Sequence, residues 1–159
     1  SLLRMVNAAG PEMDQGETVT VFNDQCVLAP SALIDAPIAW EVTDPQHVRG
    51  VFTRGAHTVT ADLVFNDAHE LIDFTSDDRA AASADGKRFI AQRWSTPLCG
   101  YHSFGTARIA ATGEGRWHPA EPGAEFTYIE FHVDALVYNG GVATHQGPAR
   151  RRHLALEAA

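Results

Sequence analysis

Apolar and polar side chains alternate along most of Thr58-Val59-Thr60-Ala61-Asp62-Leu63-Val64-Phe65-Asn66. This period of two is typical of a β-strand with one buried face, because successive side chains of a strand point to opposite sides of the sheet. Val59, Leu63 and Phe65 therefore share the face that we expect to be buried. Working outward from this stretch, the same reasoning predicts strands over residues 38–42, 48–54, 70–74, 88–94, 106–111 and 126–138.

The predicted strands follow one another through short turns, without the crossover helices that parallel strands need. The predicted fold class is therefore α+β, predominantly antiparallel β, with a curved meander sheet or half-barrel of about seven strands. The stretch 97–105 is interpreted as a turn or strand bend, and Gly113-Glu114-Gly115 as a break between strands. We place a single antiparallel β domain at residues 1–140 and a C-terminal tail at 141–159.

The residues before the first strand have two interpretations. The run 18–22 is β-branched and would suit a strand. Asp14 and Glu17, however, have the spacing of a capping box, and Val19 and Phe22 begin an apolar stripe at helical spacing. We predict a helix over residues 14–28, ended by Pro30. This N-terminal helix is expected to cover the buried face of the sheet.

Charge and composition exclude several functions. The chain has 159 residues and a formal net charge of −8, and a nucleic-acid backbone would repel that charge. We expect no nucleic-acid partner. No segment reaches the roughly 20 apolar residues that cross a membrane, so we expect no transmembrane segment. A cytoplasmic location is taken as the default. Cys26 and Cys99 fit no metal-binding spacing and are interpreted as buried thiols, or as a disulfide if the protein is exported.

Aromatic residues on different predicted strands suggest an apolar ligand cavity. Trp40, Trp94 and Phe131 lie on three of these strands, and a partly closed sheet often leaves an interior between sheet and helix. The alternative is that these side chains only fill the core or stabilise hairpins. The residues expected to bind a ligand are Trp40, Trp94, Phe131, Tyr128, Glu130 and His132.

The last predicted strand carries a row of polar side chains. Tyr128, Glu130, His132 and Asp134 would share one face at a period of two. Glu130 can orient His132 as an acid/base pair, and a histidine with two carboxylates can bind a divalent metal. The alternative is a solvated outer face of an antiparallel sheet. No HExxH, GxSxG, GxGxxG or P-loop pattern occurs, so no catalytic residue, metal ligand or cofactor is assigned.

Two sequence motifs resemble a known family. The stretch Gly10-Pro11-Glu12-Met13-Asp14-Gln15-Gly16-Glu17 is followed by Pro30-Ser31-Ala32-Leu33-Ile34 and then by Ala39-Trp40. This order resembles a bacterial domain family of unknown function, in which a "GPE…GE" helix leads to a "P-[TS]-A-L-L" turn and a strand with tryptophan. The resemblance covers roughly residues 3–139 and supplies no catalytic residues. The expected fold is also loosely similar to bacterial lipoprotein carriers and related lipid-binding half-barrels.

Members of that family usually have further strand-like sequence upstream of the helix. The resemblance therefore implies that this chain is a C-terminal portion or a shortened relative, with an exposed sheet edge and a possible homodimer through it. Our leading hypothesis is a non-enzymatic binding domain for an apolar or lipid-like ligand. The alternatives are a hydrolase or metal-dependent enzyme that uses Glu130, His132 and Asp134, and a protein-interaction module.

Overall fold

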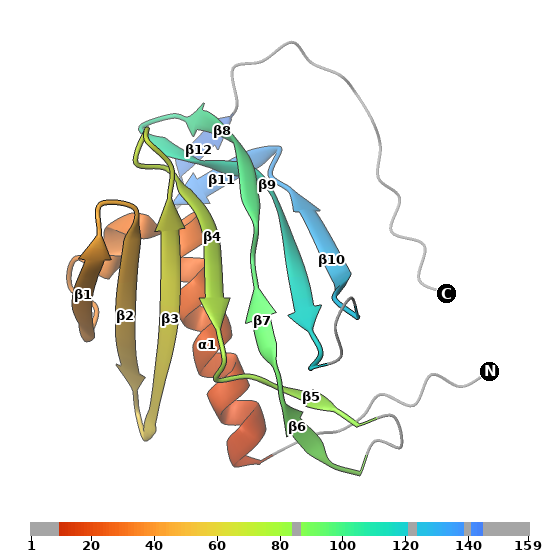
Figure 1. Ribbon diagram of the computed structural model, residues 1–159. Helices are drawn as coiled ribbons and strands as arrows, with labels where there is room; N and C mark the ends of the chain where they lie inside the picture. The colour runs from red at the N-terminus through yellow and green to blue at the C-terminus, as the bar shows by residue number, and fades with distance from the viewer. Residues whose placement is uncertain (1–9, 84–86, 121–123, 139–140, 145–159) are drawn as a thin grey trace.

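A computed structural model describes residues 10–83, 87–120, 124–138 and 141–144. In these residues one α-helix and one 3₁₀-helix accompany twelve strands (Figure 1). Their bounds are α1 (Pro11–Leu28), η1 (Pro30–Leu33), β1 (Ile38–Asp44), β2 (His47–Arg54), β3 (His57–Phe65), β4 (Leu71–Ser76), β5 (Ala80–Ala82), β6 (Phe89–Ala91), β7 (Arg93–Ser95), β8 (Leu98–Phe104), β9 (Ala107–His118), β10 (Phe126–His132), β11 (Ala135–Tyr138) and β12 (Gly141–Thr144).

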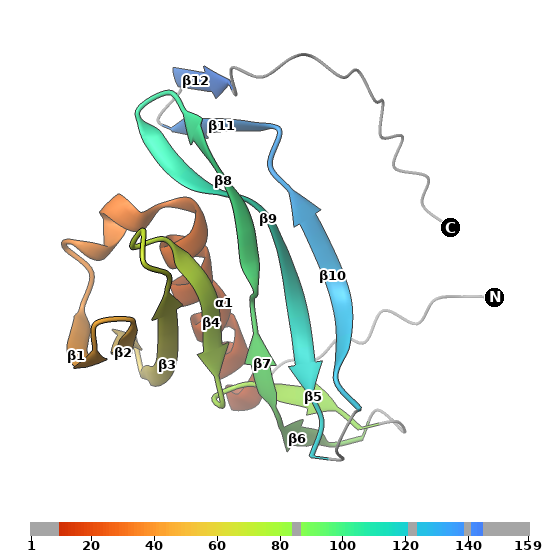
Figure 2. The ribbon, with the colours of Figure 1, turned by 45° about the horizontal axis from the view of Figure 1, so that its top comes forward.

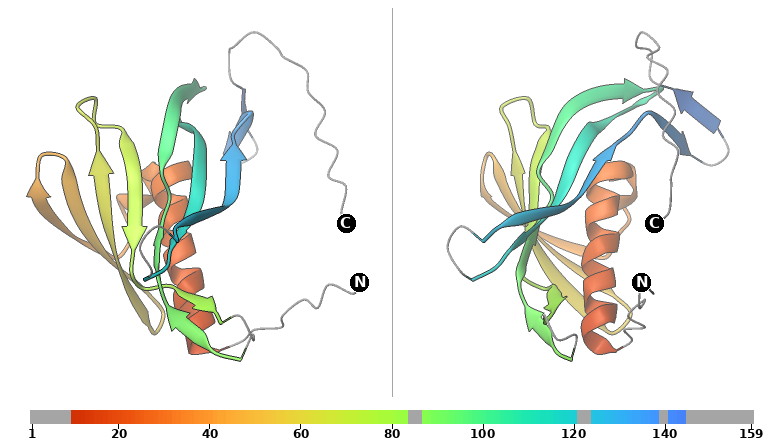
Figure 3. Two further views of the ribbon diagram at one scale, coloured as in Figure 1. Left: turned by 45° about the vertical axis from the view of Figure 1, so that its right-hand side comes forward. Right: turned by 90° about the vertical axis from the view of Figure 1, so that its right-hand side faces the viewer.

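The main sheet has the strand order β1-β2-β3-β4-β7-β9-β10, and every neighbouring pair is antiparallel. β8 follows β7 along the same side of β9. The sheet stays open, with β1 and β10 as its edge strands, and curves around α1, which lies on one side of it (Figures 2 and 3). The predicted α+β class, with a curved antiparallel sheet under an N-terminal helix, is confirmed.

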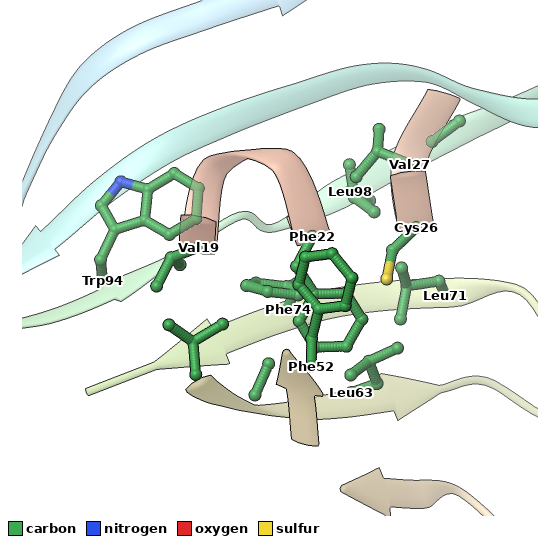
Figure 4. Close-up of a cluster of buried hydrophobic side chains, with 13 residues drawn as sticks. Val19, Phe22, Cys26, Val27, Phe52, Leu63, Leu71, Phe74, Trp94 and Leu98 are labelled. Atoms are coloured by element: carbon green, nitrogen blue, oxygen red, sulfur yellow. The ribbon is translucent and has the colours of Figure 1, made fainter. Parts of the chain in front are cut away.

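The helix packs on the sheet through one apolar stripe, which contains Val19, Phe22 and Cys26 (Figure 4). Phe22 is fully buried, and its ring centroid lies 5.2 Å from that of Phe52 and 5.4 Å from that of Phe74. Fully burying a phenylalanine side chain contributes roughly 1.5–3 kcal/mol. Burial of this stripe therefore stabilises a helix over residues 18–22, although the β-branched residues of that segment would also suit a strand.

The helix begins three residues before the predicted start. Pro11 occupies the first turn, where the missing N–H of proline removes no hydrogen bond, and no side chain caps the helix. The capping box expected at Asp14 was therefore wrong. The hydroxyls of Thr18 and Thr20 donate to carbonyl groups four residues earlier, at 2.8 and 3.1 Å, which accommodates these polar side chains inside the helix.

Three glycines allow large side chains to lie across the neighbouring strand. A Cβ atom at Gly50 would lie 2.7 Å from the rings of both Trp40 and Phe22. A Cβ atom at Gly113 would overlap the ring of Phe131, and one at Gly115 would lie 2.6 Å from Ile129. Gly113-Glu114-Gly115 therefore lies inside β9, and the predicted strand break there was wrong. The glycines are needed because their cross-strand partners are large, not because the chain turns.

Several strand boundaries also differ from the prediction. The stretch 97–105, expected to be a turn or bend, contains β8, whose alternation is interrupted at Gly100 with φ of +66°. The predicted strand 88–94 divides into β6 and β7, and the predicted strand 126–138 divides into β10 and β11. β12 pairs with β11 beyond residue 140, the boundary expected for the domain. The predicted tail from residue 145 onward lies outside the described residues.

Candidate functional site

A pocket of about 170 Å³ lies where the main sheet divides between β4 and β8. β4 pairs with β7 through Thr75 and Ser76, and beyond Thr96 the chain follows β9 instead of β4. The two parts are linked by the Tyr101 hydroxyl, which donates to the carbonyl of Leu71 at 2.9 Å. The tyrosine side chain therefore connects the two parts of the sheet and lines the pocket between them.

The walls of the pocket are mostly apolar and come from six elements and one turn. Helix α1 contributes Cys26 and Val27, and η1 contributes Leu33 at the rim. The full lining is Cys26, Val27, Pro30, Leu33, Leu63, Phe65, His69, Leu71, Tyr101, Arg108 and Ile109. For comparison, an apolar cavity of about 150 Å³ stays dry and accepts a benzene molecule. This pocket therefore accommodates an aromatic ring or the end of an alkyl chain.

A network of polar groups lies at the edge of the pocket. Arg108 forms an ion pair with Glu70 and donates to the carbonyl of Tyr101 at 3.3 Å. Glu70 also accepts a hydrogen bond from the Asn66 amide at 3.0 Å. The bonds from Asn66 and then from Arg108 lower the pKa of the Glu70 carboxyl below its usual value. The network therefore combines a guanidinium with an ionised carboxylate beside an apolar interior.

The thiol inside the pocket is chemically inert. Burial raises the pKa of Cys26 to about 12, so the thiol is neutral near pH 7, and only a thiolate is an effective nucleophile. Cys99 is also a free thiol, but it is exposed on β8. The expectation of two buried thiols therefore holds for Cys26 and was wrong for Cys99, and the alternative disulfide does not form in this structure.

The three predicted aromatic ligands occupy different environments. Trp94 is 4% exposed and belongs to the core, where the Arg79 guanidinium lies 4.4 Å from its ring centroid. Trp40 is 42% exposed on the edge strand β1. Phe131 is half-buried over Gly113. A second pocket is lined by Glu12, Gln15, Asp77, Asp78, Arg79, Ala80, Phe89 and Ala91. None of the three aromatic residues lines this pocket or the pocket beneath Tyr101.

The predicted polar row on the last strand is split between the two faces of the sheet. The register between β9 and β10 shifts at Tyr128, which is an extra residue in β10. The Tyr128 ring lies 6.0 Å from that of Trp117 on the concave face of the sheet, which is the face toward α1. Glu130 and His132 lie on the opposite, convex face. His132 contacts Thr112 at 3.3 Å and Asp134 at 3.4 Å. In the part of the chain that the structure describes, no three His, Cys, Asp or Glu side chains could hold a metal ion.

A hydrogen-bonded chain on the convex face was missed by the sequence analysis. The Ser95 hydroxyl lies 2.8 Å from His118 Nε2, and His118 Nδ1 lies 3.4 Å from the Glu125 carboxylate. The order of groups is that of a serine–histidine–acid triad. Ser95 is only 2% exposed, however, and lies in the middle of the sheet, so a substrate carbonyl cannot reach it. We interpret these residues as structural, because their contacts connect β7, β9 and the segment before β10.

A family model for a family of unknown function, DUF6544, matches residues 1–131. The chain belongs to this family. The match confirms the resemblance to a family of unknown function and extends from the N-terminal segment through α1 and the main sheet into β10. No curated protein and no solved structure matches the chain. Among the described residues, no helix combines the length and apolarity needed to cross a membrane.

Proposed function

We propose that this chain is a non-enzymatic binding domain for an apolar or lipid-like ligand held in the pocket beneath Tyr101. The observation that carries the proposal is the apolar lining of that pocket at the division of the sheet. Small-molecule sites are typically concave, mostly apolar and supplied with a few polar groups that orient the ligand. Here Arg108 and Glu70 would supply that polar edge.

The size of the pocket favours an amphiphile over a fully enclosed ligand. About 170 Å³ holds a ring or a short alkyl segment, so a longer molecule would keep its polar end outside. Burying about six methylene groups would contribute about 5 kcal/mol before the entropic cost of binding is subtracted. Because association itself costs at least about 4 kcal/mol, apolar burial alone gives very weak binding, and contacts of the polar end with Arg108 or Glu70 would have to add to it.

The proposal is tested by filling the pocket from its rim. Leu33 lines the pocket, and a tryptophan there occupies its entrance. The adjacent Ile34 is 82% exposed and lines neither pocket, which makes Ile34→Trp a matched control. We expect Leu33→Trp to lose binding of a medium-chain fatty acid, measured by native mass spectrometry and by displacement of an environment-sensitive dye. Ile34→Trp should bind like the wild type.

Two outcomes would contradict the ligand proposal. One is a wild-type protein that retains no added fatty acid and shows no dye binding in its native state. The other is unchanged binding by a correctly folded Leu33→Trp variant, which would place the ligand elsewhere. Release of a retained molecule on denaturation would identify the natural ligand by its mass.

We also propose that the protein is cytoplasmic, because an exposed thiol such as that of Cys99 stays reduced there. We also propose a homodimer through a sheet edge. The open sheet supports this, because an edge strand offers unpaired main-chain groups to another chain. We propose β10 as the pairing strand, and its side chains determine the register of the dimer.

A further inference from the structure

The outer main-chain groups of β10 are unpaired among the described residues, where the strand pairs with β9 on one side. The N–H of Val133 donates to the carbonyl of Ala111 in β9 at 2.8 Å. The main-chain groups of successive residues in a strand point in alternate directions. Glu130 and His132 therefore direct their N–H and C=O groups away from β9, toward the free edge.

Within one copy the Glu130 side chain has no partner among the described residues, whereas His132 contacts Thr112 through Nδ1 and Asp134 through Nε2. Glu130 lies opposite Glu114 of β9, and like charges directly opposite each other are destabilising. Glu114 is compensated by Arg116 at 2.8 Å, but no hydrogen bond or ion pair joins Glu130 to another described residue. His132 is 63% exposed, and its charged contact is Asp134 at 3.4 Å.

We propose that this chain forms a homodimer by antiparallel pairing of β10 with β10 of a second copy, with the two-fold axis at Phe131. Glu130 of each copy then lies opposite His132 of the other, and each of these pairs exchanges both of its main-chain hydrogen bonds. Nε2 of His132 then donates to the facing Glu130 carboxylate in place of its contact with the exposed Asp134. Ile129, which is 51% exposed in one copy, lies opposite Val133 of the second.

The neighbouring registers do not provide this complementarity. A two-fold axis at Glu130 sets two carboxylates opposite each other. An axis at His132 sets Glu130 opposite Asp134 of the second copy. An axis at Ile129 leaves Glu130 and His132 opposite aromatic side chains. Charge therefore selects the register at Phe131, and the outward direction of the main-chain groups is consistent with it.

The register is tested by reversing the two charged positions separately and together. Glu130→Lys places a cation opposite His132, and His132→Glu places two carboxylates opposite each other. Because each change occurs twice in the dimer, we expect each single variant to raise the dimer Kd about 10-fold or more. The double variant restores opposite charges and should restore dimerisation. Sedimentation equilibrium from about 1 μM to about 1 mM measures these changes.

Glu41→Lys is the matched control, because it reverses an exposed carboxylate on β1, the other edge strand. It should leave the Kd unchanged, and thermal unfolding verifies that each variant folds. A wild-type protein that stays monomeric throughout would overturn the proposal. So would dissociation by Glu41→Lys, or a double variant that fails to recover the dimer. The measurement needs no ligand, so its failure is distinct from failure of the proposed binding function.

Discussion

Gly50→Ala is expected to destabilise the protein, although alanine is the better residue in an unconstrained strand. A Cβ atom at Gly50 would lie 2.7 Å from Phe22 Cζ and 2.7 Å from Trp40 Cζ3. Trp40 is on the edge strand and 42% exposed, so its ring can move. Phe22 cannot retreat, because it is fully buried against the rings of Phe52 and Phe74.

The expected magnitude follows from two opposing effects. Replacing a strand glycine by alanine gains roughly 0.5–1 kcal/mol of conformational entropy. Overpacking a well-packed core costs typically 1–3 kcal/mol. The net loss of unfolding free energy should therefore be about 1–2 kcal/mol, or a decrease in Tm of a few degrees.

Urea denaturation followed by tryptophan fluorescence measures this loss directly. Gly16→Ala is the control, since a Cβ atom there meets nothing within 4 Å and the position is helical. It should stabilise the protein by about 1 kcal/mol. If Gly50→Ala is as stable as the wild type while Gly16→Ala behaves as expected, then close packing of Trp40 and Phe22 does not explain why position 50 holds a glycine.

Further predictions concern the pocket and its edge. Tyr101→Phe removes the hydrogen bond to the β4 main chain and should cost about 1 kcal/mol in urea denaturation; no measurable loss would show that this bond does not hold the sheet together. The pKa of Glu70 is lowered in the fold, so its stabilising contribution is present above the unfolded-state pKa and is lost as the pH falls through the folded-state value. Glu70→Gln should flatten that acid-side loss of Tm, and an unchanged acid limb would contradict this assignment. In native protein near pH 7 a thiol reagent should modify Cys99 rapidly and Cys26 only after unfolding, whereas equal rates would indicate that the pocket is open to solvent.

The correct and incorrect strand predictions have a common physical origin. The strand from Val59 to Phe65 could be predicted because a half-buried strand imposes an alternation of apolar and polar residues on its own sequence. β8 was missed because Gly100, at φ of +66°, interrupts the alternation. Gly113 looked like a break, but its function depends on Phe131 in the neighbouring strand. When a cross-strand partner determines which residue a position requires, the neighbouring sequence does not indicate it.

The candidate site was less predictable than the fold. The aromatic residues singled out from the sequence are real strand residues, but whether a side chain lines a cavity or fills the core depends on how elements pack. The bond from Tyr101 to Leu71 joins residues 30 positions apart, and no spacing rule anticipates it. The polar row was split because a bulge at Tyr128 changes the side to which that one side chain points.

The fold class and the covering helix of this protein could be predicted from the amino-acid sequence alone. Both follow from periodic burial along neighbouring residues, which the order of apolar side chains records directly. Tertiary structure alone decided where the sheet divides, which side chains line the resulting pocket, and that Glu130 lies opposite Glu114 at a free edge. These properties depend on strand register and on contacts between distant segments, because the energy of each contact belongs to a pair of residues that only the fold brings together.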